Sequence, residues 1–578
     1  MAIRLAQTAG FCMGVKRAVD IVLDVAQKSH NRKIYTYGPL IHNPQTIDLL
    51  KKRGIFPIDR IEEIDPADNA ILIIRAHGIS PAERELIRKR GVTVIDATCP
   101  KVAHVQAIIK KHAARDYTTV IVGDREHPEV NGLLGYAGTQ GIVVSEESEV
   151  AGLPEVAHLC VVAQTTQNMD EYKRIVAAIR VRFPEAVIFN TICDSTERRQ
   201  SEVKNLATDS DAMVIIGGKD SANTRRLAEM SKQEGKPTFH IETVEELKGK
   251  PMTAYTNIGV SAGASTPNWI INRVVDTLRE LQGGKPGQLG PLARFWTMTV
   301  KTELYSAFGA GCLAYTGMLL QGMTPLPAAI LAMVLYVFAM HTLNRLFDRK
   351  TRTIIGSFRE ETYLTHEKRY VVMALLFLLG ALFLASTLGM VPFTLLLLIS
   401  ILGILYNIPI LPFRGGLRRL KDLPGSKNLS VALAWGAVGA LMPGLSLGMV
   451  PSPVMGVAFG FIFAVVFIRS SMSDLLDIQS DRLIGRETIP VVIGEMRTRQ
   501  LLTGITILTG GVLSFAFLSG WTSSLALVLI ACLFYILICF KLYDRRSGLS
   551  GVVLEGLLET MYVITGAASL LWTLAARF

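Results

Sequence analysis

Long apolar segments divide the second half of this 578-residue chain, and they constrain the fold more than any other feature. A helix needs about 20 apolar residues to cross a hydrocarbon core about 30 Å thick. Nine segments of about that length lie near residues 298–320, 324–343, 370–389, 391–411, 429–448, 452–472, 499–519, 522–541 and 552–575. We therefore expect an all-α membrane bundle of about nine transmembrane helices over residues 292–578, with the lipid bilayer as a partner.

Charged residues occupy alternate loops between these segments. The loops QGMTP, STLGMVP, SLGMVPSP and SGWTSS carry no charge, whereas the alternate loops are rich in Lys and Arg. Because basic loops stay on the cytoplasmic side, we expect an inner (cytoplasmic) membrane protein with its first domain in the cytoplasm and its C-terminus outside. The net charge of +11 is then explained by topology and requires no nucleic acid partner.

The first half of the chain has a different pattern. Short Val/Ile-rich runs such as AILIIRA, VTVIDA and TVIVG alternate with polar, helix-patterned stretches such as AERELIRKR. This rhythm is typical of parallel α/β units. The stretch GGKPGQLGP resembles a linker, so we expect a soluble domain at 1–282, a linker at 283–291 and a membrane domain at 292–578. The opening MAIRLAQTAGFCMGVK has no apolar core of signal-peptide length, which predicts a reducing, cytosolic setting.

Three cysteines of the soluble half share a setting. Cys12, Cys99 and Cys193 each follow a predicted strand and precede a predicted helix, and they are 87 and 94 residues apart. The near-equal spacing predicts three similar lobes around a shared centre, with one thiolate at the end of a strand in each. Three thiolates suit an iron–sulfur cluster with one iron left free of protein ligands. The alternative is ordinary buried thiols, which we expect for Cys160 inside a strand.

Polar residues also follow the predicted strands. His42, His77 and His127 stand just after strands, and small polar residues stand beside glycines at Ser221, Asn223 and Ser265. Imidazoles, short side chains and helix N-termini suit an anionic diphosphate. Each residue alone is equally consistent with a turn or a helix cap.

The motifs GFCMGV, HN, AHG, DATCP, HPEV, QTT, TIC with a following RQ, SAN and GAS occur in this order. Together they resemble the LytB/IspH family, 4-hydroxy-3-methylbut-2-enyl diphosphate reductases, across residues 1–282. The resemblance implies an α/β trefoil around a [4Fe-4S] cluster on Cys12, Cys99 and Cys193. It also implies reduction of the hydroxylated allylic diphosphate to isopentenyl and dimethylallyl diphosphate, in non-mevalonate isoprenoid biosynthesis.

The resemblance assigns roles to the polar residues. Glu129 is the expected proton donor, since a carboxylic acid can protonate a departing hydroxyl, and Thr165 would link that hydroxyl to Glu129. The expected substrate-binding residues are His42, His77, His127, Thr165, Ser221, Asn223 and Ser265. No dinucleotide-binding glycine fingerprint is present, so we expect electrons from an external donor such as ferredoxin or flavodoxin.

The membrane half contains a second candidate site. In SDLLDIQSDRLIGRETIP, Asp474, Asp477 and Asp481 are spaced by three and four residues, which on a helix places them on one face. Carboxylates so placed suit Mg²⁺ carrying a diphosphate, although a solvated helix end would share the pattern. With the nine-segment count, this half resembles the UbiA-type intramembrane prenyltransferases over about 292–578.

The family's first aspartate motif is altered in this chain. The segment NRLFDRKTR has Arg345 and Arg352 where acids are usual, and retains Asn344 and Asp348. The candidate residues for metal and diphosphate are Asn344, Asp348, Asp474, Asp477 and Asp481. Loss of two carboxylates weakens Mg²⁺ binding, whereas arginine can contact diphosphate directly.

Three functions are consistent with these patterns. The chain is a bifunctional reductase and prenyltransferase, a reductase with a silent prenyltransferase-like anchor, or a membrane binding or transport module with a degenerate soluble domain. The retained cysteines and Glu129 argue against the third, and the altered aspartate motif keeps the second open.

Overall fold

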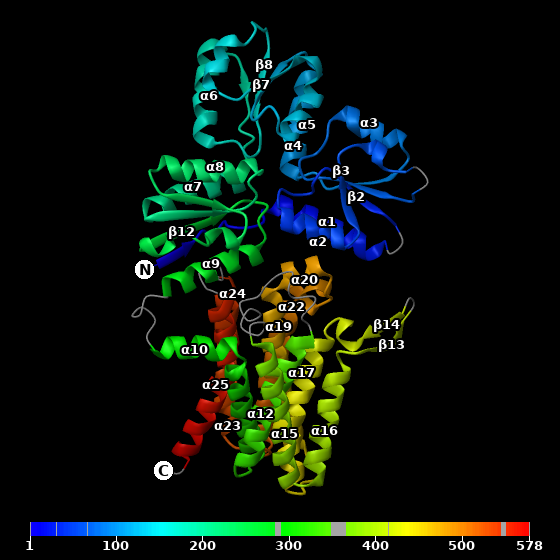
Figure 1. Ribbon diagram of the computed structural model, residues 1–578, viewed down its shortest axis with the longest axis vertical. Coiled ribbons are helices and arrows are strands. Elements are labelled where there is room, and N and C mark those ends of the chain that lie inside the picture. Colours follow the sequence, from blue (N-terminus) through cyan, green and yellow to red (C-terminus); the bar gives the residue numbers. More distant parts are fainter. Residues whose placement is uncertain are drawn as a thin grey trace. The chain divides into compact units, whose positions relative to one another are not determined.

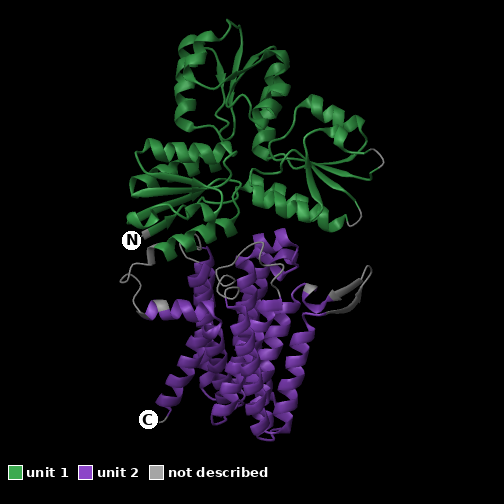
Figure 2. Cartoon of the chain, in the orientation of Figure 1, with its two compact units in different colours: residues 1–284 green, residues 285–578 purple. Residues whose placement is uncertain are grey.

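The computed structural model describes residues 2–29, 32–65, 68–283, 291–347, 366–413, 416–544 and 551–576. The chain forms two compact units, residues 1–284 and 285–578 (Figure 2). The predicted metal-site residue Asp348 and most of the predicted linker lie outside the described residues.

The first unit contains three four-stranded sheets in which every strand pairing is parallel (Figure 1). One sheet has the order β1 (Ala2–Leu5), β12 (Asn257–Ala262), β10 (Ala212–Ile216), β11 (Thr238–Ile241). The second has the order β3 (Ile55–Ile58), β2 (Ile34–Tyr37), β4 (Ile71–Ile74), β5 (Thr93–Asp96). The third has the order β7 (Gly141–Val144), β6 (Thr118–Val122), β8 (Leu159–Ala163), β9 (Val187–Ile188).

Apolar runs form the central strands because helices cover both faces of a parallel sheet. All residues of β4, β8 and β10 are buried, including Cys160 in β8, as expected for a packing residue. The covering helices are α1 (Met13–Lys28), α2 (Pro44–Lys52), α3 (Pro81–Lys89), α4 (Pro100–Ala113), α5 (Pro128–Ala137), α6 (Met169–Arg182), α7 (Asp194–Thr208), α8 (Ala222–Gln233) and α9 (Asn268–Gly283).

The three lobes are not three consecutive stretches of chain. The N-terminal strand β1 pairs with β12 near the end of the unit, so both ends of the unit build one sheet (Figure 1). The cysteine spacing predicted three similar α/β lobes, and the sheets confirm their similarity. The lobe that carries Cys12 is nevertheless completed only by residues 212–283.

The second unit is helical. Among its described residues, seven helical segments are long and apolar enough to cross a membrane. They are α12 (Pro327–Phe347), α15 (Glu367–Thr387), α17 to α18 (Ser426–Ser446), α19 (Pro453–Leu476), α22 (Glu495–Leu518), α23 with α24 (Leu525–Asp544) and α25 (Gly551–Ala575). Two shorter apolar helices are α11 (Leu304–Leu320) and α16 (Met390–Leu405). The unit is therefore a multi-pass membrane region, and the count of nine stays a prediction.

Two predicted spans differ from the structure. The span expected at 298–320 is divided into α10 (Pro291–Lys301) and α11, because Glu303 adopts a φ of 62° that a right-handed helix cannot contain. The span expected at 391–411 ends with α16, and β13 (Pro409–Phe413) then pairs antiparallel with β14 (Gly416–Arg419). The prolines of β13 lack the N–H that a helix needs.

Candidate functional site

Three adjacent strands of each sheet in the first unit end at predicted site residues. The carboxyl ends of parallel strands meet at one edge of a sheet, where α/β proteins place their ligands. The edge strands β1, β5 and β9 lead to Cys12, Cys99 and Cys193; their neighbours β12, β4 and β8 lead to Ser265, His77 and Thr165. The next strands, β10, β2 and β6, lead to Ser221 with Asn223, to His42, and to His127 with Glu129.

A backbone hydrogen bond joins each cysteine to the neighbouring strand's loop. The Cys193 N–H donates to the Thr165 carbonyl at 2.9 Å, and the Cys99 N–H donates to the Ala76 carbonyl, next to His77, at 2.9 Å. The Cys12 N–H donates to the Ala264 carbonyl, next to Ser265, at 3.2 Å. Each thiol is thus held beside one of the predicted substrate-binding residues.

The three cysteine side chains converge. Each cysteine is the residue immediately before a helix, α1, α4 or α7. A Cβ atom added to Gly14 would lie 2.6 Å from Cys99 Sγ and 4.0 Å from Cys12 Sγ, so only glycine fits between these sulfurs. Burial raises the pKa of the Cys99 thiol, and the nearby thiols of Cys12 and Cys193 raise it further. One site therefore receives all three sulfur atoms.

The spread of the sulfurs indicates the size of a group that they could hold. Among the described His, Cys and acidic side chains, His42, His77 and His127 are the group whose ligand atoms all lie within 4.8 Å of one another. The sulfur atoms of Cys12, Cys99 and Cys193 do not all lie within 4.8 Å of one another. Zn–S bonds are about 2.3 Å long, so the cysteine site is too wide for a single ion and suits a polynuclear cluster.

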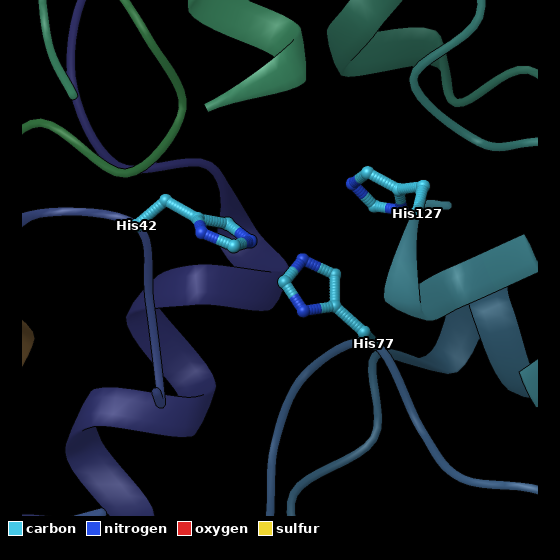
Figure 3. Close-up of side chains that lie close together, drawn as sticks. All are labelled: His42, His77 and His127. Atoms are coloured by element: carbon cyan, nitrogen blue, oxygen red, sulfur yellow. The ribbon is translucent and has the colours of Figure 1, made fainter. Parts of the chain in front are cut away.

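The three histidines face one another (Figure 3). Their ring centroids are 5.1 Å apart for His42 and His77, 5.3 Å for His77 and His127, and 6.3 Å for His42 and His127. Burial is the largest cause that lowers the pKa of His42 and His77, and it lowers the pKa of His127 to about 3. The rings are therefore neutral at pH 7.

Two observations indicate which ligand the histidines suit. His42 Nε2 and His77 Nδ1 are buried without a hydrogen-bond partner among the described residues. Arg75 lowers the pKa of all three histidines and Arg225 lowers that of His42 and His127, whereas Asp220 raises that of His42, so most of the charges that act on the cluster are positive. Although three imidazoles can hold a metal ion, these positive charges favour an anion.

Ser265 and the loop before α8 both contact the His42 carbonyl. Ser265 Oγ donates to the His42 carbonyl at 3.2 Å. A Cβ atom added to Gly218 would lie 2.5 Å from that carbonyl oxygen, so the loop before α8 packs directly against His42. Ser221 Oγ accepts the Thr224 N–H and so caps α8, and its predicted role in diphosphate binding stays a prediction. Asn223 Nδ2 is buried without a partner among the described residues.

Glu129 and Thr165 form a buried pair. The Glu129 side chain is 1% exposed, the Thr165 N–H donates to its Oε1 at 2.6 Å, and Thr165 Oγ1 donates to its Oε2 at 2.9 Å. Burial raises the pKa of Glu129. The Glu129 N–H also donates to His127 Nδ1 at 3.2 Å. The predicted proton donor therefore lies between the histidines and the Thr165 loop that contacts Cys193.

Arg199 is a buried cation that the sequence did not predict as a site residue. Arg199 is 2% exposed and donates to the carbonyls of Gly10 and Ala262 at 3.0 and 2.8 Å. These bonds tie the loop before Cys12 to the helix that follows Cys193. Arg199 belongs to the RQ that follows Cys193, so the sequence motif already pointed to this residue.

The acidic residues of the membrane unit are close together but do not share a helix. Helix α19 ends at Leu476 and α20 (Ile478–Ile484) begins after Asp477, which corrects the expected single helix face because Asp477 has non-helical torsion angles. Burial raises the pKa of Asp481, and the carboxylates of Asp477 and Asp474 raise it further. Asp474 Oδ1 lies 3.0 Å from Lys427 Nζ, and its Oδ2 accepts from Asn428 at 2.7 Å.

The altered first motif makes contacts within the protein. Asn344 Oδ1 accepts from Asn407 Nδ2 at 2.6 Å. Arg345 forms an ion pair with Glu303, which is 2% exposed, and His341 Nδ1 lies 3.4 Å from the same carboxylate. Arg345 is thus half of a buried ion pair in the place of a metal ligand. Glu303 is the single acidic residue of the mostly uncharged segment TMTVKTELYSAF, and this isolation was the feature of the sequence that could have predicted a role for it.

Comparison with known proteins agrees with this division of the chain. Residues 3–279 match the LytB protein family. The 4-hydroxy-3-methylbut-2-enyl diphosphate reductase of Aquifex aeolicus (strain VF5) is 44% identical over 284 residues, which cover 97% of that protein and 49% of this chain. The chain belongs to the LytB family. The family's region ends before the membrane unit, where residues 304–552 match the UbiA prenyltransferase family.

Solved structures are also similar to parts of this chain. The E-1-hydroxy-2-methyl-but-2-enyl-4-diphosphate reductase from Plasmodium falciparum is similar with 29% identity and a TM-score of 0.47, covering 49% of this chain and 89% of that one. A UbiA homologue from Archaeoglobus fulgidus, solved with GPP and Mg²⁺, is 18% identical with a TM-score of 0.36, and covers 48% of this chain and 98% of that one.

Proposed function

We propose that the LytB-family domain reduces 4-hydroxy-3-methylbut-2-enyl diphosphate to isopentenyl and dimethylallyl diphosphate. The observation that carries the proposal is the buried Glu129–Thr165 pair between a histidine cluster suited to diphosphate and a three-cysteine site. The reaction replaces a C–O bond by a C–H bond. It consumes two electrons and two protons and releases one water molecule, so it needs an electron source and a proton donor in one place.

The three cysteines fit an iron–sulfur cluster of the [4Fe-4S] type. Three convergent thiols, too far apart for one ion, are the donor set that such a cluster requires, and Gly14 leaves room between two of them. When bound, the cluster supplies single electrons and a Lewis-acidic iron that no protein side chain occupies. The three cysteines are partly exposed, which suits electron delivery by an external ferredoxin- or flavodoxin-like carrier.

The side chains perform the binding and proton-transfer parts of the reaction. His42, His77 and His127, with Ser221, Asn223 and Ser265, hold the diphosphate near the positive charges of Arg75 and Arg225. Thr165 Oγ1 holds the substrate hydroxyl next to Glu129. Burial keeps Glu129 protonated at a higher pH than an exposed carboxyl group, so it can protonate the leaving hydroxyl.

The full-length protein, purified without oxygen in detergent with its cluster intact, tests this function. Chemically reduced methyl viologen replaces the natural carrier, and the products are separated by mass spectrometry. The proposal expects both five-carbon diphosphates. A cluster-loaded protein that binds the hydroxylated diphosphate but leaves it unreduced would contradict it.

A second activity, prenyl transfer to an acceptor in the membrane, is the proposal for the UbiA-family domain. The carboxylates of Asp474 and Asp477, which lie near enough to Asp481 to raise its pKa, favour it, because carboxylates are ligands that Mg²⁺ prefers. The first motif does not fit a metal over residues 344–347, where Arg345 is paired with Glu303. Mg²⁺-dependent transfer from a panel of prenyl diphosphates to membrane acceptors tests the proposal, and no transfer across the panel would favour a silent anchor.

The topology forms part of this proposal. We infer nine spans, with α11 and α16 crossing the bilayer beside the seven longer segments. The charged loops then lie on the cytoplasmic side, together with the reductase domain, and the C-terminus lies outside. Cysteine labelling from each side of sealed vesicles tests this arrangement.

A further inference from the structure

Arg226 connects two of the three lobes. It lies on α8, one turn after Asn223, and its side chain is 10% exposed. Its Nη1 donates to the Thr166 carbonyl at 2.8 Å, and its Nη2 forms an ion pair with Asp124 Oδ1 at 2.6 Å. Asp124 follows β6 and Thr166 follows β8, so one guanidinium holds two loops of the neighbouring sheet.

The two loops that Arg226 holds are those that carry the proposed proton-transfer pair. The Asp124 N–H donates to Gln164 Oε1 at 3.0 Å, and Gln164 Nε2 donates to Thr166 Oγ1 at 3.0 Å. Thr165, which lies between Gln164 and Thr166 in the chain, donates hydrogen bonds to Glu129 from both its N–H and its hydroxyl. The Arg226 contacts therefore close a ring of hydrogen bonds around the Thr165 loop.

We propose that the Arg226–Asp124 ion pair is a positioning device of the reductase, which sets the distance between the diphosphate-binding end of α8 and the proton-transferring Glu129–Thr165 pair. The inference rests on the proposed reductase function. The substrate is held at both of its ends, so the spacing of these ends decides whether its hydroxyl group reaches Thr165. A shift of about 1 Å in such a spacing can cost 100-fold in rate.

The same pair balances the charge near Glu129. Burial raises the pKa of Glu129 most strongly, and the Thr165 hydrogen bonds lower it; of the charged groups, Arg226 lowers this pKa and Asp124 raises it, so these two effects oppose each other. The other polar groups that face the carboxyl are Thr165 and, through the Glu129 backbone, His127. Glu171 of α6 and Glu229 of α8 also act on the charge of Arg226. Removal of either partner alone therefore changes the net charge that acts on Glu129.

Two single variants then have effects of opposite sign. A proton donor is active below its pKa, so the rate falls as the pH rises through that value. In Arg226→Gln the pKa of Glu129 rises. The alkaline limb of the kcat profile, the range in which kcat falls as the pH rises, then moves up by about one pH unit. In Asp124→Asn the pKa falls, and the limb moves down by a similar amount. In the double variant the limb returns close to its wild-type position.

A conservative variant separates position from charge. Arg226→Lys keeps the positive charge, but a single ammonium cannot bridge Asp124 and the Thr166 carbonyl in the geometry of a guanidinium. We expect the alkaline limb to stay in place while kcat falls about 10-fold or more. Far-ultraviolet circular dichroism and the visible absorbance of the cluster show that each variant is folded and loaded.

The rate measurements use full-length, cluster-loaded protein with reduced methyl viologen. A second measurement follows the ionisation of Glu129 without turnover, through a carboxyl infrared band that is absent in Glu129→Gln. Equal losses of rate at every pH, with no movement of the limb or the band in either single variant, would overturn the proposal. So would an Arg226→Lys variant with wild-type kcat. Failure of the wild-type protein to reduce the substrate counts against the reductase function instead, and the infrared titration still tests the charge balance.

Discussion

The backbone N–H of Cys193 donates a hydrogen bond to the carbonyl oxygen of Thr165 at 2.9 Å. Thr165 in turn donates to both carboxyl oxygens of Glu129. A thiol suited to metal binding and a buried acid are therefore joined through one residue. This link places the expected source of electrons and the expected source of protons at a fixed separation, which a reaction that needs both requires.

Replacement of Cys12, Cys99 or Cys193 by serine should remove the cluster and the reductase activity together. Each thiol supplies one of the three converging sulfurs, and a hydroxyl is a poor ligand for iron–sulfur clusters. Visible absorbance, iron content and turnover measure the effect. Cys160→Ala is the matched control, because Cys160 is buried inside β8 and should leave all three unchanged. A serine variant that kept its absorbance and turnover would refute the assignment.

Gly14→Ala should lower the iron content of the purified protein without unfolding it. Its new methyl group would lie 2.6 Å from Cys99 Sγ and would displace a sulfur from the site. Gly152→Ala serves as the control, since no atom lies within 4 Å of its added Cβ. Full iron content in Gly14→Ala would show that the cysteine site lies elsewhere.

Glu129→Gln should keep the cluster and lower kcat by about 10²- to 10⁴-fold, the range expected for a lost general acid. The amide oxygen can accept the Thr165 N–H and the amide NH2 can donate to Thr165 Oγ1 in place of the second accepted bond, but the amide cannot supply the proton. Stopped assays at saturating substrate measure the loss. Glu126→Gln changes an exposed acid three residues before Glu129 and should leave kcat unaltered. Wild-type turnover in Glu129→Gln would exclude the proton role.

Inorganic diphosphate should bind with proton uptake and should bind more weakly as the pH rises from 6 to 8. The free histidines are neutral at pH 7, because burial lowers the pKa of each of them below its usual value. A bound anion stabilises the protonated form and raises their pKa, so binding takes up protons, and high pH opposes it. Calorimetry in buffers of different ionisation heat measures the uptake. Binding heats that do not depend on the buffer would contradict the prediction.

Asp474→Asn should weaken Mg²⁺-dependent binding of a prenyl diphosphate to the membrane domain about 10-fold or more, since it removes one of the carboxylates proposed to bind Mg²⁺. Equilibrium binding of labelled geranyl diphosphate with Mg²⁺ or with EDTA measures the change. Asp544→Asn is the control, because Asp544 is an exposed acid that pairs with Arg499. Equal affinity in the presence of Mg²⁺ and of EDTA would favour the alternative that the membrane domain is a silent anchor.

Much of the candidate site was accessible from local sequence pattern. A cysteine or histidine directly after a strand must lie at the sheet's carboxyl edge, so Cys99 and His77 were placed correctly by their own neighbours. Arg226 could not be found in this way. Its partners Asp124 and Thr166 lie on another sheet, and no periodicity links residues that meet only after the lobes pack.

The sequence by itself determined the division into an α/β half and an apolar helical half, because the length and period of apolar runs are local properties of the chain. It also determined which residues follow strands. Only the tertiary structure decided that β1 completes the last sheet and that Glu303 turns inward to pair with Arg345. Strand pairing and buried charge pairing select partners by hydrogen bonding and desolvation across long sequence separations, and these energies exist only in the folded chain.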